Sequence, residues 1–115
     1  MEPFSIFSLG DCLLVSVQEE IDDRSIKSLT GLLGERVAEK NARAVIIDLH
    51  DVEIVDTFLA EHLAGLVSFL SLLRAKVMVA GLQAPVILTL IDFDIRLKGV
   101  GFALDVEQAL AKLNR

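Results

Sequence analysis

Short apolar runs alternate along this chain with longer segments in which apolar residues recur every three or four positions. Short runs of this kind are typical of β-strands, whereas the longer periodic segments are typical of amphipathic helices. The strand-like runs are CLLVSV (12–17), AVIIDL (44–49), KVMVAGL (76–82) and VGFAL (100–104). AVIIDL is rich in β-branched residues and has no polar residue before Asp48, which predicts a strand buried on both faces of its sheet.

A helix is expected after each of these strands. The segment 19–41 is apolar along one side, with Asp22 or Asp23 available as an N-cap and Asn41 where the helix should stop. The other helices are expected from about Thr57 to Leu73, within PVILTLIDFDIRL (85–97) and within DVEQALAKLNR (105–115). The third segment begins with a proline, which suits the first turn of a helix.

The expected helix at 57–73 is unusually apolar. Its leucines recur in steps of four and three at Leu59, Leu63, Leu66, Leu70 and Leu73. Further apolar side chains widen this stripe until the helix is apolar nearly all round. A helix of this kind needs cover on more than one side, and another chain could supply part of that cover.

Alternating strands and helices predict an α/β fold with parallel strand pairs joined by right-handed crossovers. A length of 115 residues fits one domain spanning 1–115. Function in such sheets resides at the carboxyl ends of the strands, and Thr57 lies just beyond one of those ends.

Composition excludes several classes of partner. The net charge is -6 and the sequence pI is about 4.8, so neither nucleic acid nor an anionic membrane surface is an expected partner. Cys12 is the only cysteine, which rules out an internal disulfide and indicates a small core residue in a reducing compartment. We see no signal peptide, and the longest apolar stretch (63–73) is too short to span a bilayer. We therefore expect a soluble, cytoplasmic protein.

Metal and catalytic sites find little support in the sequence. Asp48, His50 and His62 could in principle ligate a metal, but the two histidines do not occur at the spacing of a zinc motif. No phosphate-binding glycine loop is present, and Thr57 and His62 are five residues apart, so they do not share a helix face. An enzyme or ligand-binding module built on Asp48, His50 and Asp56 is kept as the rival interpretation. We expect no metal and no cofactor.

The segment DVEIVDTFLAEHL (51–63) raises a different question, because an acidic residue and a threonine stand where a helix begins. Asp56 or Thr57 would cap the helix. Thr57 is also placed for covalent switching, since a helix N-terminus tolerates a phosphate and a loop held by a strand is open to another enzyme. Residues 44–73 include five acidic residues and no Lys or Arg, so a phosphate would add charge to a surface that is already negative.

The stretch VIIDLHDVEIVDTFLAEHL (45–63) resembles STAS domains, the modules of bacterial anti-sigma factor antagonists. The segments 12–23, 75–95 and 103–113 look like the RsbS-type stressosome subunit, so the resemblance covers nearly the whole chain. It implies a mixed sheet of about four to five strands with about four helices. No sensor domain precedes the matching segment, as expected for an RsbS-type subunit and not for its RsbR-type partners.

The resemblance also implies a function. In that family the hydroxyl residue after the Asp is phosphorylated by an RsbT-type switch serine/threonine kinase, and this position is Thr57. The unphosphorylated subunit joins RsbR-type subunits and copies of itself in an assembly that sequesters the kinase, and phosphorylation releases the kinase. We expect a non-catalytic scaffold whose kinase-docking site includes Asp51, Glu53, Asp56 and Phe58.

Two alternatives remain open within the same resemblance. RsbS-type subunits usually carry serine at the position of Thr57, while threonine is familiar in RsbR-type partners, so the rate of phosphorylation or the choice of kinase could differ. A simpler STAS antagonist would bind an anti-sigma factor kinase directly, without a large assembly.

Overall fold

The computed structural model describes residues 2–114, and these form a five-stranded mixed sheet and four helices. The strands are β1 (Phe4–Leu9), β2 (Cys12–Val17), β3 (Ala44–Asp48), β4 (Lys76–Ala80) and β5 (Val100–Ala103). The helices are α1 (Asp23–Lys40), α2 (Thr57–Leu72), α3 (Ala84–Asp92) and α4 (Val106–Leu113). The predicted α/β class is confirmed, and most elements begin and end within a few residues of the expected positions.

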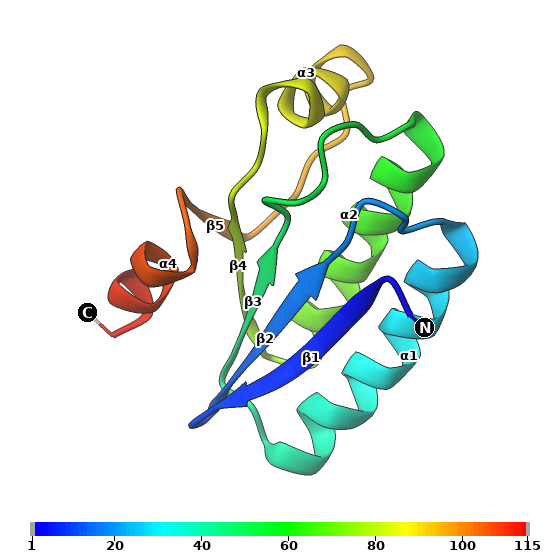
Figure 1. The fold of residues 1–115 in the computed structure, drawn as a ribbon. Coiled ribbons are helices and arrows are strands. Elements are labelled where there is room, and N and C mark those ends of the chain that lie inside the picture. Colours follow the sequence, from blue (N-terminus) through cyan, green and yellow to red (C-terminus); the bar gives the residue numbers. More distant parts are fainter. Residues whose placement is uncertain (1, 115) are drawn as a thin grey trace.

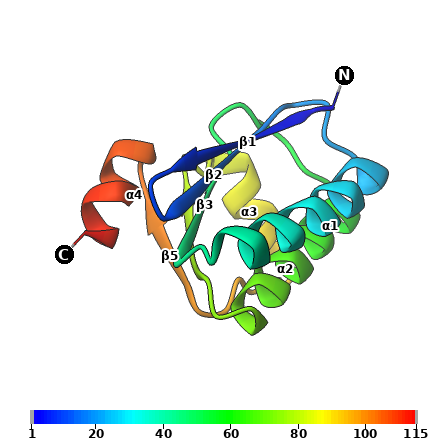
Figure 2. The ribbon, with the colours of Figure 1, turned by 90° about the horizontal axis from the view of Figure 1, so that it is seen from below.

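The strands lie in the sheet in their order along the chain, from β1 to β5. β1 is antiparallel to β2, and every later pair is parallel. Parallel neighbours need crossover connections, which α1, α2 and α3 provide. Figures 1 and 2 show α1 and α2 on one face of the sheet and α4 on the opposite face.

The main hydrophobic core lies between the sheet and the helices α1 and α2. Alternate residues of the central strands enter it, among them Val15, Ile47 and Val79, each at most 1 % exposed. On the opposite face, the small side chains of Cys12, Ala44 and Ala80 allow α4 to pack against the sheet. All five residues of β3 are buried, which confirms the strand predicted to be covered on both faces. Cys12 is also buried, as expected of a core residue.

Strand β1 was not predicted. Its sequence is FSIFSL. Only Phe4 is buried and Ile6 is half-buried, while the other four residues are exposed. Pairing with β2 makes it a strand, because Phe4 lies opposite Val17 and Ile6 lies opposite Val15. The antiparallel β1–β2 hairpin therefore departs from the strict alternation that was expected and makes the sheet mixed.

Helix α3 is shorter than the apolar pattern of residues 85–97 indicated. It ends at Asp92, and Asp94 adopts a left-handed conformation with φ of 52°. The N–H of Ile95 then donates to the carbonyl of Leu90 at 2.9 Å, which closes the end of the helix. Residues 93–99 continue as an irregular segment toward β5.

Helix α2 buries most of the predicted stripe, with Leu63, Leu66 and Leu70 at most 5 % exposed, but Leu73 follows the helix and is 38 % exposed. It contacts α1, β4 and α3, so its broad apolar surface is covered from several sides within this chain. Phe58 at its start and Leu72 at its end stay exposed, at 64 % and 82 %. Among residues 2–114, no helix has the length and apolar character needed to cross a membrane.

Candidate functional site

Residues 49–56, here called the β3–α2 loop, connect the carboxyl end of β3 to the start of α2. Three apolar side chains anchor this loop to the core, because Leu49, Val52 and Val55 are only 3 %, 1 % and 7 % exposed. The N–H of Val52 donates to the carbonyl of Leu49 at 2.9 Å, which forms a tight turn. The loop is therefore a packed part of the fold whose outward residues are held in place.

Neighbouring elements hold the same loop from two sides. The Glu19 carboxylate, which follows β2, accepts a hydrogen bond from the N–H of Glu53 at 2.9 Å. The hydroxyl of Thr89 in α3 lies 3.5 Å from the carbonyl of Val55. Both contacts join residues more than thirty positions apart, so the shape of the loop depends on the whole fold.

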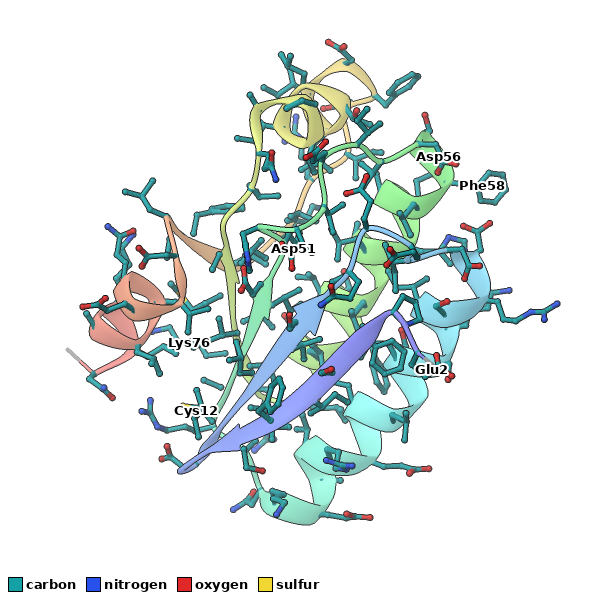
Figure 3. The ribbon with its side chains drawn as sticks, in the orientation of Figure 1. Glu2, Cys12, Asp51, Asp56, Phe58 and Lys76 are labelled. Atoms are coloured by element: carbon teal, nitrogen blue, oxygen red, sulfur yellow. The ribbon has the colours of Figure 1, made fainter. Side chains whose placement is uncertain are left out.

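The outward side of the loop is acidic with one large apolar residue. Asp51, Glu53 and Asp56 are exposed, and Ile54 between them is 70 % exposed. Figure 3 shows Asp51 near the end of β3, and Asp56 and Phe58 together at the start of α2. The structure thus places the four residues of the expected docking site along one loop and the first turn of the next helix.

Asp56 is the N-cap of α2. Its backbone is extended, with φ of -86° and ψ of 172°, and its side chain accepts a hydrogen bond from the N–H of Leu59 at 2.8 Å. Thr57 is the first residue of the helix and is half-buried. The sequence left open whether Asp56 or Thr57 caps the helix, and the structure assigns that role to Asp56. The Thr57 hydroxyl is therefore not committed to capping.

Phe58 projects outward beside Thr57. Its ring stacks on the His62 ring one turn later, with centroids 6.0 Å apart and the planes inclined by 26°. His62 Nδ1 lies 2.8 Å from the Phe58 carbonyl, which fixes the histidine against the helix. With Ile54, Phe58 gives the acidic surface around Thr57 two exposed apolar side chains.

Three ionisable residues meet where β3 ends. The Asp48 carboxylate accepts the N–H of His50 at 3.1 Å and contacts His50 Nδ1 at 2.8 Å. His50 Nε2 lies 3.2 Å from the Asp51 carboxylate. Asp48 is 9 % exposed, whereas the His50 side chain is 61 % exposed. The hydrogen bond with Asp48, reinforced by the negative charge of both carboxylates, raises the pKa of His50 above its usual value.

We expect the stability of the protein to depend on the protonation of His50. A histidine whose pKa is higher in the folded state contributes most below its unfolded pKa of about 6.5, and that contribution is lost as the pH rises through the folded pKa. The free energy of unfolding of the wild type relative to His50→Gln should therefore fall as the pH increases from about 5.5 to about 8.5. Urea unfolding of both proteins across this range measures the difference, which should be small because His50 is exposed.

A third protein serves as a comparison for this pH dependence. Asp51→Asn removes the negative charge from the longer of the two His50 contacts and keeps the contact with Asp48. Its stability relative to His50→Gln should keep most of the decline with pH. A difference between wild type and His50→Gln that is flat with pH would contradict the proposed coupling.

The residues of the rival metal or enzyme interpretation are not gathered into one site. Asp48 and His50 are bonded to each other, while Asp56 is occupied as the cap of α2 and His62 stacks on Phe58. Within residues 2–114 no group of three His, Cys, Asp or Glu side chains is arranged to hold a metal ion. The geometry gives that interpretation no further support.

Two features of this region were not anticipated from the sequence. Ile54 was not singled out, although Val52 and Val55 at a spacing of three could have identified the buried side of the loop. Gly81, at the end of β4, has a φ of +73°, and a Cβ there would lie 2.8 Å from His50 Cβ. A glycine directly after a strand was the available signal, but nothing local indicated what it approaches.

Comparison with known proteins gives both a family and a set of similar folds. The model of the STAS domain family matches residues 6–109, which is most of the chain. No curated protein matches the sequence. Solved structures do match, and the similarity extends over almost all of the chain.

Three of these structures illustrate the sequence identities and TM-scores of the matches. A serine-to-glutamate variant of RsbS from Moorella thermoacetica is 24 % identical with a TM-score of 0.85, covering 96 % of this chain and 94 % of that one. A structure describing the architecture of the stressosome, a signal integration and transduction hub, gives the same identity and TM-score, covering 96 % of both chains. The Bacillus cell fate determinant SpoIIAA, in its phosphorylated form, is 10 % identical with a TM-score of 0.71, covering 96 % of this chain and 98 % of that one.

Proposed function

This chain belongs to the STAS domain family, and from that premise we propose that it is a non-catalytic antagonist of the stressosome type. It sequesters an RsbT-type switch serine/threonine kinase and releases that kinase once Thr57 is phosphorylated. It acts in the cytoplasm, together with RsbR-type STAS subunits and further copies of itself, as one STAS domain over residues 1–115.

The observation that carries this proposal is the division of roles between Asp56 and Thr57. Asp56 caps α2, so Thr57 at the first helical position keeps its hydroxyl for chemistry. A phosphate on that hydroxyl would sit beside the free N–H groups and partial positive charge of the helix N-terminus, which stabilise an anion. The packed β3–α2 loop leads directly to Thr57, so the fold holds the backbone on which the hydroxyl stands.

The surface around Thr57 supports a docking role. Asp51, Glu53 and Asp56 provide negative charge, and Ile54 and Phe58 provide exposed apolar area. An interface of this composition suits a partner with basic residues around an apolar centre. A phosphate adds roughly -1.5 to -2 charges, so the modified surface would attract the basic partner but distort or block the apolar contact beside it. The kinase is released if the bulk and hydration of the phosphate outweigh its attraction to the basic residues of the kinase. Acidic groups of the kinase facing Thr57 would have the same effect.

Structures of similar proteins support the same proposal. One of them is SpoIIAA in a phosphorylated form, and another is RsbS with a serine replaced by glutamate. A third belongs to a stressosome. The fold shared with this chain therefore occurs in a phosphorylated protein and in a large signalling assembly. Kinase sequestration and the use of Thr57 are our extension of that similarity to this chain.

Phosphorylation of Thr57 would transfer one phosphoryl group from ATP to its hydroxyl. The Thr57 hydroxyl oxygen attacks the γ-phosphorus of ATP bound to the kinase, the bond to the β-phosphate oxygen breaks, and ADP leaves. The hydroxyl proton passes to a base of the kinase, so the chain described here supplies only the acceptor. This is why we class the protein as non-catalytic.

Incubation with an RsbT-type kinase and ATP, followed by phosphopeptide mapping, tests the proposal. We expect one phosphate, on Thr57, and no phosphate on Thr57→Val, which keeps the shape of the side chain without its hydroxyl. Ser68 lies exposed on the same helix and is the internal control for non-specific transfer. Phosphate on Ser68 or elsewhere with Thr57 unmodified, under conditions where the kinase modifies an RsbR-type subunit, would contradict the assignment.

The same preparations separate the stressosome role from a simpler antagonist. Size-exclusion chromatography with an RsbR-type subunit should yield a large assembly that retains the kinase. A one-to-one complex with a kinase, and no assembly with RsbR-type subunits, would favour direct antagonism instead.

A further inference from the structure

A second candidate site lies between α3, β5 and α4, and no residue of the β3–α2 loop lines it. It is a groove of about 730 Å³, within the ~300–1,000 Å³ of typical small-molecule pockets. Its apolar walls include Ile91 of α3, Phe102 of β5 and Leu104, which are 67 %, 45 % and 80 % exposed. Exposing several large apolar side chains around one groove is unfavourable in water and marks a surface that a ligand can cover.

Two side chains of α4 supply polar groups to this groove. Gln108 and Lys112 are four residues apart and so lie on one face of the helix. The Gln108 Oε1 accepts the N–H of Leu104 at 2.8 Å, and Lys112 Nζ donates to the carbonyl of Phe102 at 2.6 Å. These bonds fix both side chains and leave the Gln108 amide N–H₂ and two Lys112 N–H groups as donors.

The same two hydrogen bonds disfavour a peptide strand as the occupant of this groove. Adjacent residues of a strand turn their backbone groups to opposite edges, and Ala103 uses its carbonyl to bind Gly81 at the β4 side. The Phe102 carbonyl therefore faces the free edge of β5, where Lys112 occupies it. A peptide strand adding to this edge would first have to displace Lys112, and Gln108 likewise occupies the N–H of Leu104.

Charge identifies where an anion would bind. Of the two cations that line the groove, Arg96 is paired with Asp94 at 3.4 Å. No carboxylate of residues 2–114 lies within 4.0 Å of Lys112 Nζ. The α4 wall thus combines a fixed amide donor with an ammonium that has no carboxylate partner among residues 2–114, next to the apolar side chains of the groove.

We propose that this groove binds a free long-chain carboxylate, a single acyl chain ending in one carboxyl group. The carboxylate accepts hydrogen bonds from Lys112 Nζ and Gln108 Nε2, and the chain lies along Ile87 and Ile91 of α3 and Phe102 of β5. This site goes beyond the role proposed for Thr57 and does not depend on it.

Titration of the purified full chain with cis-parinaric acid, a fluorescent C18 carboxylate, tests the proposal. We expect saturable binding of one molecule per chain. Lys112→Gln should weaken binding of the acid about tenfold and leave binding of its methyl ester nearly unchanged, because only the acid carries the charge that Lys112 recognises. A merely structural role of Lys112 would affect acid and ester equally.

Ile91→Asp places a charge on the apolar wall and should abolish binding. Leu88→Asp is the matched control, since Leu88 lies on the same helix, is 57 % exposed and does not line the groove, and it should bind as the wild type does. Absence of saturable binding, or unchanged binding by both Lys112→Gln and Ile91→Asp, would overturn the proposal. So would a dimer of the ligand-free chain that Ile91→Asp dissociates, or binding to phosphatidylglycerol vesicles without binding to the free acid.

Discussion

Replacing Thr57 by aspartate should weaken the binding of an RsbT-type kinase by roughly 30-fold, or about 2 kcal/mol, while the protein stays folded. The new carboxylate stands between Asp56 and Phe58 along the chain, within the proposed docking surface to which Ile54 also contributes. Its hydration must be removed on docking, and it forces water into the apolar contact that Ile54 and Phe58 make. Titration calorimetry with the purified kinase measures the change.

The fold should tolerate this substitution, because a carboxylate in the first turn of α2 interacts favourably with the helix dipole. Thr57→Val should bind the kinase about as well as the wild type, since it keeps the shape and adds no charge. Ser68→Asp adds the same charge at an exposed position of the same helix and should also leave binding unchanged. Equal affinity of Thr57→Asp and wild type would refute the switch mechanism, and loss of binding by Ser68→Asp would point to a general charge effect.

Gly81→Ala should lower the free energy of unfolding by about 2–4 kcal/mol. Gly81 has a φ of +73°, which costs roughly 1–2 kcal/mol for a residue with a Cβ. The added Cβ would also lie 2.8 Å from His50 Cβ and 3.1 Å from the His50 backbone, so the start of the β3–α2 loop must shift. Urea unfolding, compared with wild type at one pH, gives the loss of stability.

Gly99→Ala separates the two causes. Gly99 also has a φ of +73°, but a Cβ there meets nothing within 4 Å. It should lose only the backbone contribution, about 1–2 kcal/mol, so the remainder at Gly81 measures the contact with His50. An equal decrease in the free energy of unfolding for both variants would show that the β3–α2 loop shifts away from the new Cβ without loss of stability. Because the loop leads to Thr57, Gly81→Ala should also slow phosphorylation, whereas Gly99→Ala should not.

Much of the architecture could be predicted from the sequence, because it depends on local periodicity. The leucine stripe of α2 and the apolar run that begins β3 were recognised from spacing and composition, and both are buried as expected except for Leu73 at the end of the stripe. Asp56 and Thr57 were also found from sequence, since a helix start is marked by adjacent residues. Strand β1 was missed, because its pattern is weak until β2 lies beside it.

The features that could not be predicted from the sequence are mostly contacts between residues far apart along the chain. The end of α3 within residues 85–97 could not be placed from the sequence, because the apolar pattern continues past Asp94, whose left-handed conformation follows the last turn. The groove beside β5 combines α3 with Lys112 of α4, and Gly81 after β4 lies against His50 of the β3–α2 loop. Neither the groove nor the approach of Gly81 to His50 can be recognised from the sequence of a single segment.

The sequence by itself determined the α/β class, the buried strands and the position of Thr57 at a helix start, since each follows from side chains close together along the chain. Only the tertiary structure decided that Asp56 takes the cap, that Glu19 and Thr89 hold the β3–α2 loop, and that Lys112 faces an apolar groove. The physical reason is that hydrogen-bond partners and burial are properties of the packed chain, and most of the groups that settle them lie far apart in sequence.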